Sequence, residues 1–140
     1  VAALLDQFAA DPIHELAQLA RAATFTAMIG NADAHGKNVA VLHEETGYIT
    51  LAPLYDTVPT TMWPNLRGTA AMPVHGRRRL HAVTLEDMLD EAYLWPLDRR
   101  RARDVSVGTA EAILDALGSL AVPPELAERI AARCRSFLAA

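Results

Sequence analysis

The stretch from residue 12 to residue 29 constrains the fold most, because its second half is apolar on nearly every side. Asp11 and Pro12 suit a helix start: an aspartate caps the free N–H groups of the first turn, and a proline needs no donor there. Apolar residues then recur at helical spacing as far as Ile29, and Gly30 follows as a stop. Such a helix is expected in the interior, where other elements pack around it.

The remaining segments predict a mostly α-helical domain with one or two short β-hairpins. Gly47 lies between two β-prone runs, where its tolerance of positive φ suits a hairpin turn. Thr84, with Asp87 three residues later, is typical of a capping box that opens a helix. The expected elements are a short N-terminal helix that ends at Asp11-Pro12, a hairpin of residues 38–42 and 48–52, a loop over 53–68, a second hairpin of 69–74 and 79–83, and helices over 84–93, 98–117 (ended by Gly118) and from 123 to near the C-terminus.

The composition excludes several classes of protein. Of the 140 residues, 51% are hydrophobic and 21% are charged, which is typical of a globular domain and not of a disordered chain. No apolar run reaches the roughly 18–20 residues that a membrane span requires. The net charge of −4 disfavours a freestanding nucleic-acid-binding protein. Cys134 is the only cysteine, so no internal disulfide can form and a cytoplasmic location is expected.

The densest group of polar residues lies between the apolar helix and the first hairpin. It contains Asp33, His35, Lys37 and Asn38, and Asp56 follows directly beyond the hairpin. Because a hairpin returns its second strand beside its first, we expect the side chains of Asp33, Asn38 and Asp56 to converge. Their hard oxygen ligands favour Mg²⁺, whereas the scattered histidines and single cysteine offer no paired spacing for zinc.

The order of these residues matches the requirements of phosphoryl transfer. Asp33 and Asn38 have the Asp-x-x-x-x-Asn spacing of a kinase catalytic loop, and Asp56 stands where a second metal-binding aspartate is expected. In that chemistry one aspartate accepts the proton of the attacking hydroxyl, while the asparagine and the second aspartate hold the metal. The spacing alone is common by chance, so each residue could instead be an ordinary turn or strand-start residue. The preceding helix, the hairpin and the Leu-Tyr-Asp beyond it make the combination specific.

Ile-Gly-Asn-Ala-Asp-Ala-His-Gly-Lys-Asn at residues 29–38 and Leu-Ala-Pro-Leu-Tyr-Asp at 51–56, together with the runs at 71–77 and 84–87, carry a family resemblance. The chain resembles the C-terminal region of HipA-type serine/threonine kinases, the toxins of bacterial toxin–antitoxin pairs. The resemblance implies that Asp33 is the catalytic base and that Asn38 and Asp56 bind Mg²⁺. It also implies that His35 and Lys37 contact the phosphates of ATP or orient Asp33.

The resemblance further implies a two-lobed, kinase-like fold with a largely helical C-terminal lobe. Residues 1–140 would be that lobe, with the catalytic loop at 30–38, the hairpin at 38–52, the metal-binding segment at 53–57 and the helical part at 84–140. The implied partners are a helix-turn-helix antitoxin, through which DNA is met only indirectly, and a protein substrate, which for several members is an aminoacyl-tRNA synthetase. No contact with a membrane is expected.

The sequence departs from the family pattern upstream of Asp33. That segment has no glycine-rich phosphate loop, and Lys37 is the only lysine of the chain. Because the chain also begins at Val1 without a signal-peptide pattern, it is expected to be a piece of a longer protein that lacks the nucleotide-binding lobe. Positioning supplies most of the catalysis in phosphoryl transfer, so we expect little activity from the piece alone.

Two other functions stay open at this point. The first is a kinase-like phosphotransferase that acts on a small molecule, and the second is a non-catalytic lobe that docks a DNA-binding partner. The arginine runs at 77–79 and 99–103 leave a similar choice. They could contact DNA or an antitoxin, since arginine neutralises phosphates, or they could be a solvated loop and a first helical turn.

Overall fold

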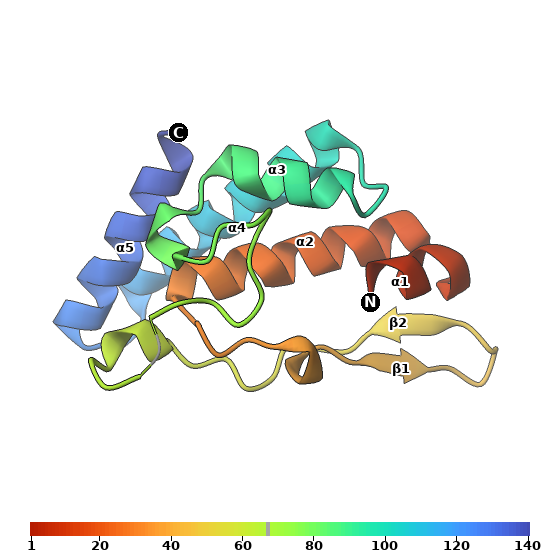
Figure 1. The fold of residues 1–140 in the computed structure, drawn as a ribbon, viewed down its shortest axis with the longest axis horizontal. Helices are drawn as coiled ribbons and strands as arrows, with labels where there is room; N and C mark the ends of the chain where they lie inside the picture. Colours follow the sequence, from red (N-terminus) through yellow and green to blue (C-terminus); the bar gives the residue numbers. More distant parts are fainter. Residues whose placement is uncertain (67) are drawn as a thin grey trace.

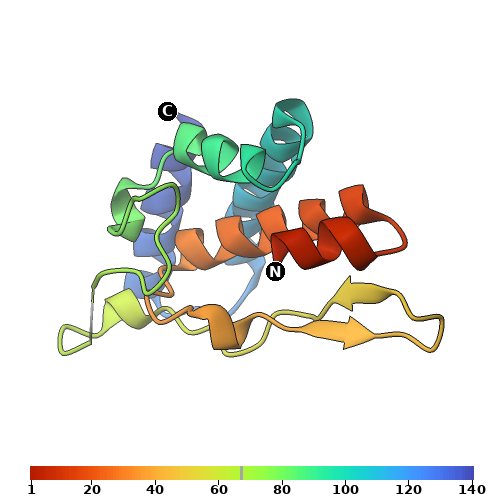
Figure 2. The same ribbon diagram turned by 45° about the vertical axis from the view of Figure 1, so that its right-hand side comes forward.

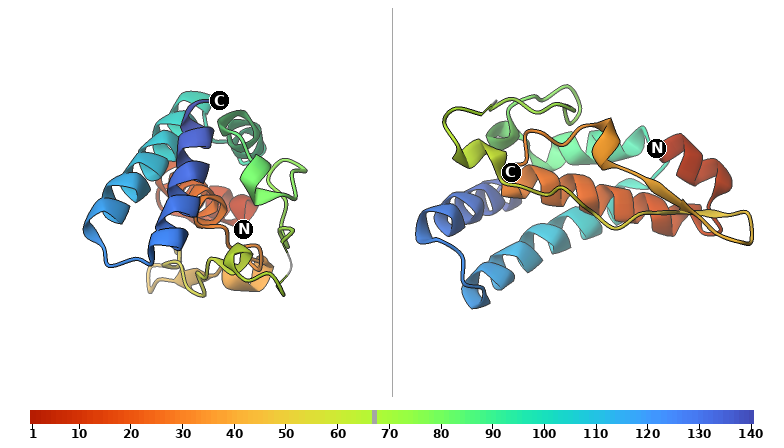
Figure 3. Two further views of the ribbon diagram at one scale, coloured as in Figure 1. Left: turned by 90° about the vertical axis from the view of Figure 1, so that its left-hand side faces the viewer. Right: turned by 90° about the horizontal axis from the view of Figure 1, so that it is seen from below.

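The computed structural model describes residues 1–66 and 68–140, and helix α2 (Pro12–Ile29) runs through its middle. Figure 1 shows α3 above α2, α4 behind it, α5 across its C-terminal end and the β-hairpin below. In the left view of Figure 3, α2 is seen along its axis with the other elements arranged around it. Leu16 and Met28 are at most 1% exposed, as expected for the central helix of the core.

The fold is mostly helical, with one antiparallel hairpin, as the sequence predicts. The α-helices are α1 (Ala2–Phe8), α2, α3 (Leu85–Tyr93), α4 (Arg99–Ser119) and α5 (Pro124–Leu138); the strands are β1 (Val41–His43) and β2 (Ile49–Leu51); and the short 3₁₀ helices are η1 (Gly36–Asn38), η2 (Thr60–Met62) and η3 (Leu80–Ala82). Among the described residues, none of these helices is both long and apolar enough to cross a membrane.

The helix starts follow the local chemistry of the sequence. The Asp11 carboxylate accepts the backbone N–H of His14 (3.0 Å), with Pro12 at the first helical position of α2. The predicted capping box of α3 is confirmed, since the Thr84 hydroxyl accepts the N–H of Asp87 and the Asp87 carboxylate accepts the N–H of Thr84. At the start of α4, the Asp98 carboxylate accepts the N–H groups of Arg100 and Arg101. These bonds satisfy N–H groups that have no partner inside the helix.

The hairpin lies along α1 and α2 (Figure 2), and the buried carboxylate of Glu15 fixes it to α2. Val41 pairs with Leu51 in its register, and Gly47, with φ of 87°, makes the predicted turn. The backbone N–H of Leu51, which points away from β1, donates to the carboxylate of Glu15 in α2 at 2.6 Å. The strands are shorter than the predicted runs because residues 36–38 form η1 before β1 begins. The hairpin therefore leads the chain from the 30–38 loop back to Asp56.

The second predicted hairpin, of residues 69–74 and 79–83, is wrong. An isolated bridge joins Val74 to Arg77 and the N–H of Ala70 donates to the carbonyl of Arg78 at 2.7 Å, but neither predicted run is a strand, and residues 80–82 form η3. The N–H of Ala71 donates instead to the carbonyl of Ala32 in the polar loop, at 2.8 Å. The expected loop over 53–68 contains η2, and residue 67 of that loop lies outside the described residues. A hydrogen bond to the polar loop has therefore replaced part of the strand pairing that was expected for residues 69–83.

Gly118 does not end α4, which continues to Ser119. A glycine inside a helix costs only about 1 kcal/mol relative to alanine, so a long packed helix tolerates it. The chain leaves the helix at Leu120, which has an extended backbone, shortly before the two prolines that open α5. The two prolines suit the start of α5, where a fixed φ and a missing N–H are tolerated.

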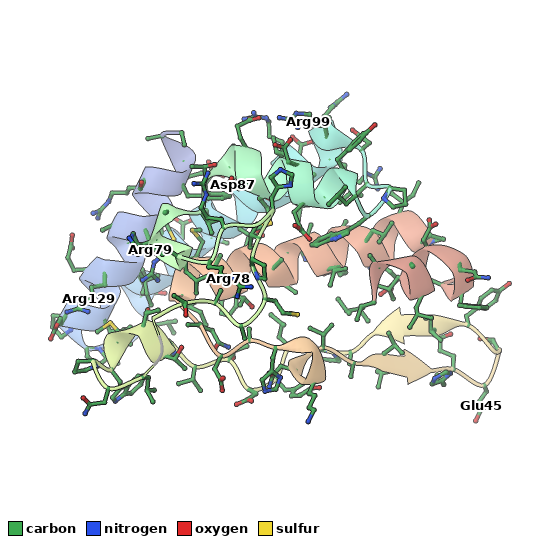
Figure 4. All side chains as sticks on the ribbon, viewed as in Figure 1. Glu45, Arg78, Arg79, Asp87, Arg99 and Arg129 are labelled. Atoms are coloured by element: carbon green, nitrogen blue, oxygen red, sulfur yellow. The ribbon has the colours of Figure 1, made fainter. Side chains whose placement is uncertain are left out.

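The first arginine of each basic run forms ion pairs within the domain. The guanidinium of Arg77 binds the carboxylate of Asp87 through two hydrogen bonds of 3.0 and 3.1 Å. Arg99 at the start of α4 binds Glu86 and Asp90 of α3, on the face labelled in Figure 4. These residues join the loop before α3 and the start of α4 to helix α3. Arg77 and Arg99 therefore have a structural role within the domain.

Candidate functional site

The structure brings Asn38 and Asp56 into direct contact, as the hairpin geometry predicts. The side-chain amide of Asn38 donates from Nδ2 to Oδ2 of Asp56 at 2.5 Å. The other end of the same amide, Oδ1, accepts the backbone N–H of His35 at 3.1 Å. Asn38 is buried, with 9% of its surface exposed, whereas Asp56 is exposed. The buried Asn38 side chain therefore holds the Asp56 carboxylate in place while that carboxylate remains exposed to solvent.

Asp33 lies at the same loop, but its carboxylate does not contact either member of the pair. No hydrogen bond to the Asp33 side chain is present within residues 1–66 and 68–140, and the residue is exposed. Its backbone N–H donates to Oδ1 of Asn31 at 3.2 Å. The carboxylate is thus free to accept a proton from an outside donor, and its placement depends on the backbone around it.

Asn31 links the two halves of this site, a role that the sequence interpretation missed. Its Nδ2 donates to the backbone carbonyl of Asp56 at 3.1 Å, while its Oδ1 holds the N–H of Asp33. Asn31 is only 3% exposed. An asparagine that bonds the backbone two residues further on is a recognised turn motif, so that half of its role had a signal in the sequence. The bond to Asp56 had none.

Thr60 is a second residue that the sequence interpretation missed. Its hydroxyl accepts the N–H of Ala32 at 2.7 Å and lies 3.4 Å from the carbonyl of Gly30, which it can donate to. The N–H of Thr61 donates to the same carbonyl at 3.1 Å. The loop and the segment beyond the hairpin are therefore joined at several backbone positions, mostly through neutral hydrogen bonds.

The backbone of Asp56 is strained. Its φ is +54°, in the left-handed region that a residue with a Cβ seldom adopts. Such a conformation costs roughly 1–3 kcal/mol and persists only where neighbouring groups hold it, which favours a functional role. Here the holding groups are the amide of Asn31 on the Asp56 carbonyl and the amide of Asn38 on its carboxylate.

His35 and Lys37 lie on the same loop with their functional groups uncommitted. Nδ1 of His35 is buried and has no hydrogen-bond partner among the described residues. Lys37 is exposed and its ammonium forms no ion pair within the described part of the chain. Its carbonyl accepts the hydroxyl of Tyr55 at 2.6 Å, which ties this end of the loop to the Asp56 segment.

These residues fit a magnesium ion better than a metal with a full protein ligand set. The described residues contain no group of three or more His, Cys, Asp or Glu side chains placed to hold a metal. The free donor at this pair is Oδ1 of the exposed Asp56 carboxylate, because Oδ2 accepts Nδ2 of Asn38 and the Asn38 amide oxygen accepts the N–H of His35. Both side chains carry hard oxygen ligands, and Asn38 would offer its oxygen beside Asp56 after its amide turns over. Mg²⁺ is usually held by one or two carboxylates and completes its shell with water and phosphate oxygens. The unpartnered Nδ1 of His35 beside this pair is also a polar group without an internal function.

A largely apolar cavity of about 280 Å³ opens beside the loop. Its walls come from α2, from the polar loop and from the segments around Tyr55 and Met72. Asn31 and Asn38 contribute polar groups to this lining. Apolar walls with a few placed polar groups are typical of small-molecule sites, so the loop borders a space that a substrate group could enter.

Cys134 takes no part in this chemistry. It is fully buried in α5. Burial raises the pKa of its thiol to about 11, against the weaker opposite effect of Arg133 and Arg135. The group is therefore a neutral thiol at neutral pH and has the character of a small core residue, not of a nucleophile.

Comparison with known proteins agrees with this architecture. The family described as "HipA-like C-terminal domain" matches residues 1–135. Over 121 residues the chain is 38% identical to a Sinorhizobium fredii (strain NBRC 101917 / NGR234) protein named "Putative kinase Y4mE", covering 79% of this chain and 27% of that protein. It superposes with a TM-score of 0.72, at 22% identity, on a chain of the toxin–antitoxin complex of HipA, HipB and operator DNA from Shewanella oneidensis MR-1. That match covers 99% of this chain and 33% of the other.

The fold is that of the largely helical C-terminal lobe of HipA-type proteins. The chain spans about a quarter of the length of the curated relative and a third of the solved one. With its match over residues 1–135, the chain belongs to the HipA-like C-terminal domain family.

Proposed function

We propose that this chain is the catalytic C-terminal lobe of a serine/threonine protein kinase that transfers the γ-phosphate of ATP to a protein hydroxyl. The observation that carries the proposal is the Asn38–Asp56 contact, with the uncommitted carboxylate of Asp33 on the same loop. The family assignment and the relative named as a kinase support the reaction class.

Each residue has a role that follows from its chemistry. Asp33 accepts the proton of the attacking hydroxyl, for which an exposed carboxylate without an internal partner is suited. The oxygens of Asn38 and Asp56 hold Mg²⁺, which when bound neutralises charge on the phosphates. His35 and Lys37 contact the phosphates or orient Asp33, since both extend from the loop without an internal ion pair.

The test is phosphate transfer by the full-length protein in a bacterial lysate supplied with labelled ATP. We expect labelled protein bands that disappear when EDTA removes Mg²⁺ and when Asp33→Asn or Asp56→Ala is introduced. Asp104→Asn on the exposed side of α4 is the matched control and keeps the activity. Retained transfer in either site variant would refute the assigned roles. Label in small solutes instead of protein bands would favour a small-molecule phosphotransferase.

We also propose that the full-length protein is the toxin of a toxin–antitoxin pair and binds a helix-turn-helix antitoxin. The support is the solved relative, which is part of a complex with HipB and operator DNA. Affinity capture with the full-length protein should recover such an antitoxin from the source cells. Recovery together with no Mg²⁺-dependent nucleotide binding would favour a purely docking role for this lobe.

A further inference from the structure

Helix α2 ends at Gly30, three residues before Asp33, and the end is unusually crowded. Gly30 has φ of 81°, and a Cβ on it would lie 2.2 Å from the hydroxyl of Thr61 and 2.6 Å from Nη1 of Arg133. Only a glycine therefore fits between these groups. The direction in which the polar loop leaves the helix is fixed by contacts from η2 and from α5.

Arg133 satisfies a carbonyl that the helix end leaves open. The N–H groups of Gly30 and Asn31 bond back to the carbonyls of Ala27 and Thr26. The next carbonyl, that of Met28, receives no backbone donor in the described residues, and Nη1 of Arg133 donates to it at 2.7 Å. Nη2 of the same guanidinium reaches the Thr61 hydroxyl at 3.4 Å. One side chain thus joins α5, the end of α2 and η2.

The guanidinium is held there without a carboxylate. Arg133 forms no ion pair in the part of the chain that the structure describes, and its Nε is buried without a partner. Burial lowers the pKa of Arg133 from its ordinary value, although a guanidinium remains charged at neutral pH. The carbonyl end of α2 carries partial negative charge and compensates the cation. A partly buried arginine without an ion pair is costly to retain, and its hydrogen bonds within the described residues lie where the polar loop begins.

We propose that Arg133 is a positioning residue for the phosphate-transfer site, holding the start of the 30–38 loop so that Asp33 faces the Asn38–Asp56 pair. The effect of Arg133 on catalysis rests on the proposed function, whereas its contacts with the start of the loop do not depend on that function. Ile130 and Phe137 anchor α5 in the core on either side of Arg133, so the guanidinium acts from a rigid support. Asn31 and Thr60 hold the loop beyond Gly30, and Arg133 holds it at its origin.

The experiment uses Arg133→Met and Arg133→Lys in the full-length protein, with Arg129→Met as the matched control. Arg129 lies one turn earlier on α5, has Glu125 as its one side-chain partner among the described residues, and points outward at the edge of the molecule (Figure 4). We expect Arg133→Met to lower kcat by about 10- to 100-fold, because a misplacement of about 1 Å costs up to this much. The KM for ATP should change by less than about threefold, and Arg133→Lys should recover part of kcat. Arg129→Met should match the wild type.

A second readout separates this inference from the proposed function. Hydrogen exchange of the full-length protein should be faster over residues 30–38 in Arg133→Met and unchanged in Arg129→Met. If the wild type transfers no phosphate, the proposed function fails, and the exchange comparison still decides the role of Arg133. If Arg133→Met does not fold, Arg133→Lys carries both measurements. Wild-type kcat per folded molecule, or wild-type exchange over the loop, would overturn the inference.

Discussion

Two regions of this domain use polar residues in opposite ways. In residues 30–61 the positioning bonds come mostly from neutral amides and hydroxyls, and no ion pair involves any described residue of that region. In residues 74–103 the charged groups bind each other: Arg77 pairs with Asp87, and Arg99 pairs with Glu86 and Asp90. The first region leaves Asp33, Lys37 and an oxygen of Asp56 uncommitted, whereas in the second Arg77 and Arg99 are paired inside the domain.

The difference teaches where a ligand can bind. A charge that already has a close partner must give it up, and pay a desolvation cost, before it can hold a phosphate or a metal. A charge on a loop that neutral groups have already placed is available without such a loss. Arg78 and Arg79 of the basic run are also exposed without an ion pair among the described residues, but the uncommitted Asp33 and Lys37 lie on the loop that carries the Asn38–Asp56 contact.

The sharpest way to break this comparison is Asn31→Leu, which keeps the size of the side chain and removes both of its bonds. We expect kcat of the full-length protein to fall about 100-fold, because the N–H of Asp33 and the carbonyl of Asp56 lose their common anchor. The free energy of unfolding should fall by about 1–3 kcal/mol from the unsatisfied groups. Steady-state kinetics and chemical denaturation measure the two. Unchanged kcat with lowered stability would make Asn31 merely structural.

Asp87→Ala tests the other region, with the opposite division between stability and activity. Asp87 is buried, and its carboxylate binds Arg77 and the N–H and hydroxyl of Thr84. Its loss removes a helix cap and a partly buried ion pair, so we expect a loss of about 2 kcal/mol in the free energy of unfolding. The kcat of the folded full-length protein should change less than threefold. A fall in kcat comparable to that of Asn31→Leu would erase the distinction between the regions.

The pH dependence of the free energy of unfolding tests the same comparison through Asp87, with a smaller expected effect. Burial alone would raise the pKa of Asp87, but the hydrogen bonds from Arg77 and Thr84 and the charge of Arg77 outweigh it and hold the pKa below the ordinary 3.8. A depressed folded-state pKa gives stability that is complete above that ordinary value and is lost as the pH falls through the folded-state pKa. Unfolding curves between pH 6 and pH 2.5 should therefore show a steeper acid loss in the wild type than in Asp87→Ala. Parallel curves would contradict this.

Much of the helical framework could be predicted from the sequence. The start of α2 at Pro12, the capping box of Thr84 and Asp87, and the Gly47 turn each depend on residues within a few positions of one another. The hairpin also places Asp56 beside Asn38, as the spacing indicates. The predictions that were wrong needed knowledge of distant partners. Residues 69–83 were expected to pair as two strands, but they make only a few such backbone contacts, while Ala71 bonds Ala32 and Arg77 bonds Asp87.

The sequence by itself determined the order of the candidate site residues, most helix boundaries and the presence of one hairpin. It did so because periodicity, caps and tight turns act between near neighbours. Only the tertiary structure decided how the polar loop is held. Asn31 reaches Asp56 across 25 positions and Arg133 reaches Met28 across 105. No local pattern encodes such contacts, since they form only when packing of α5 and the hairpin against α2 brings the groups within hydrogen-bonding distance and removes competing water.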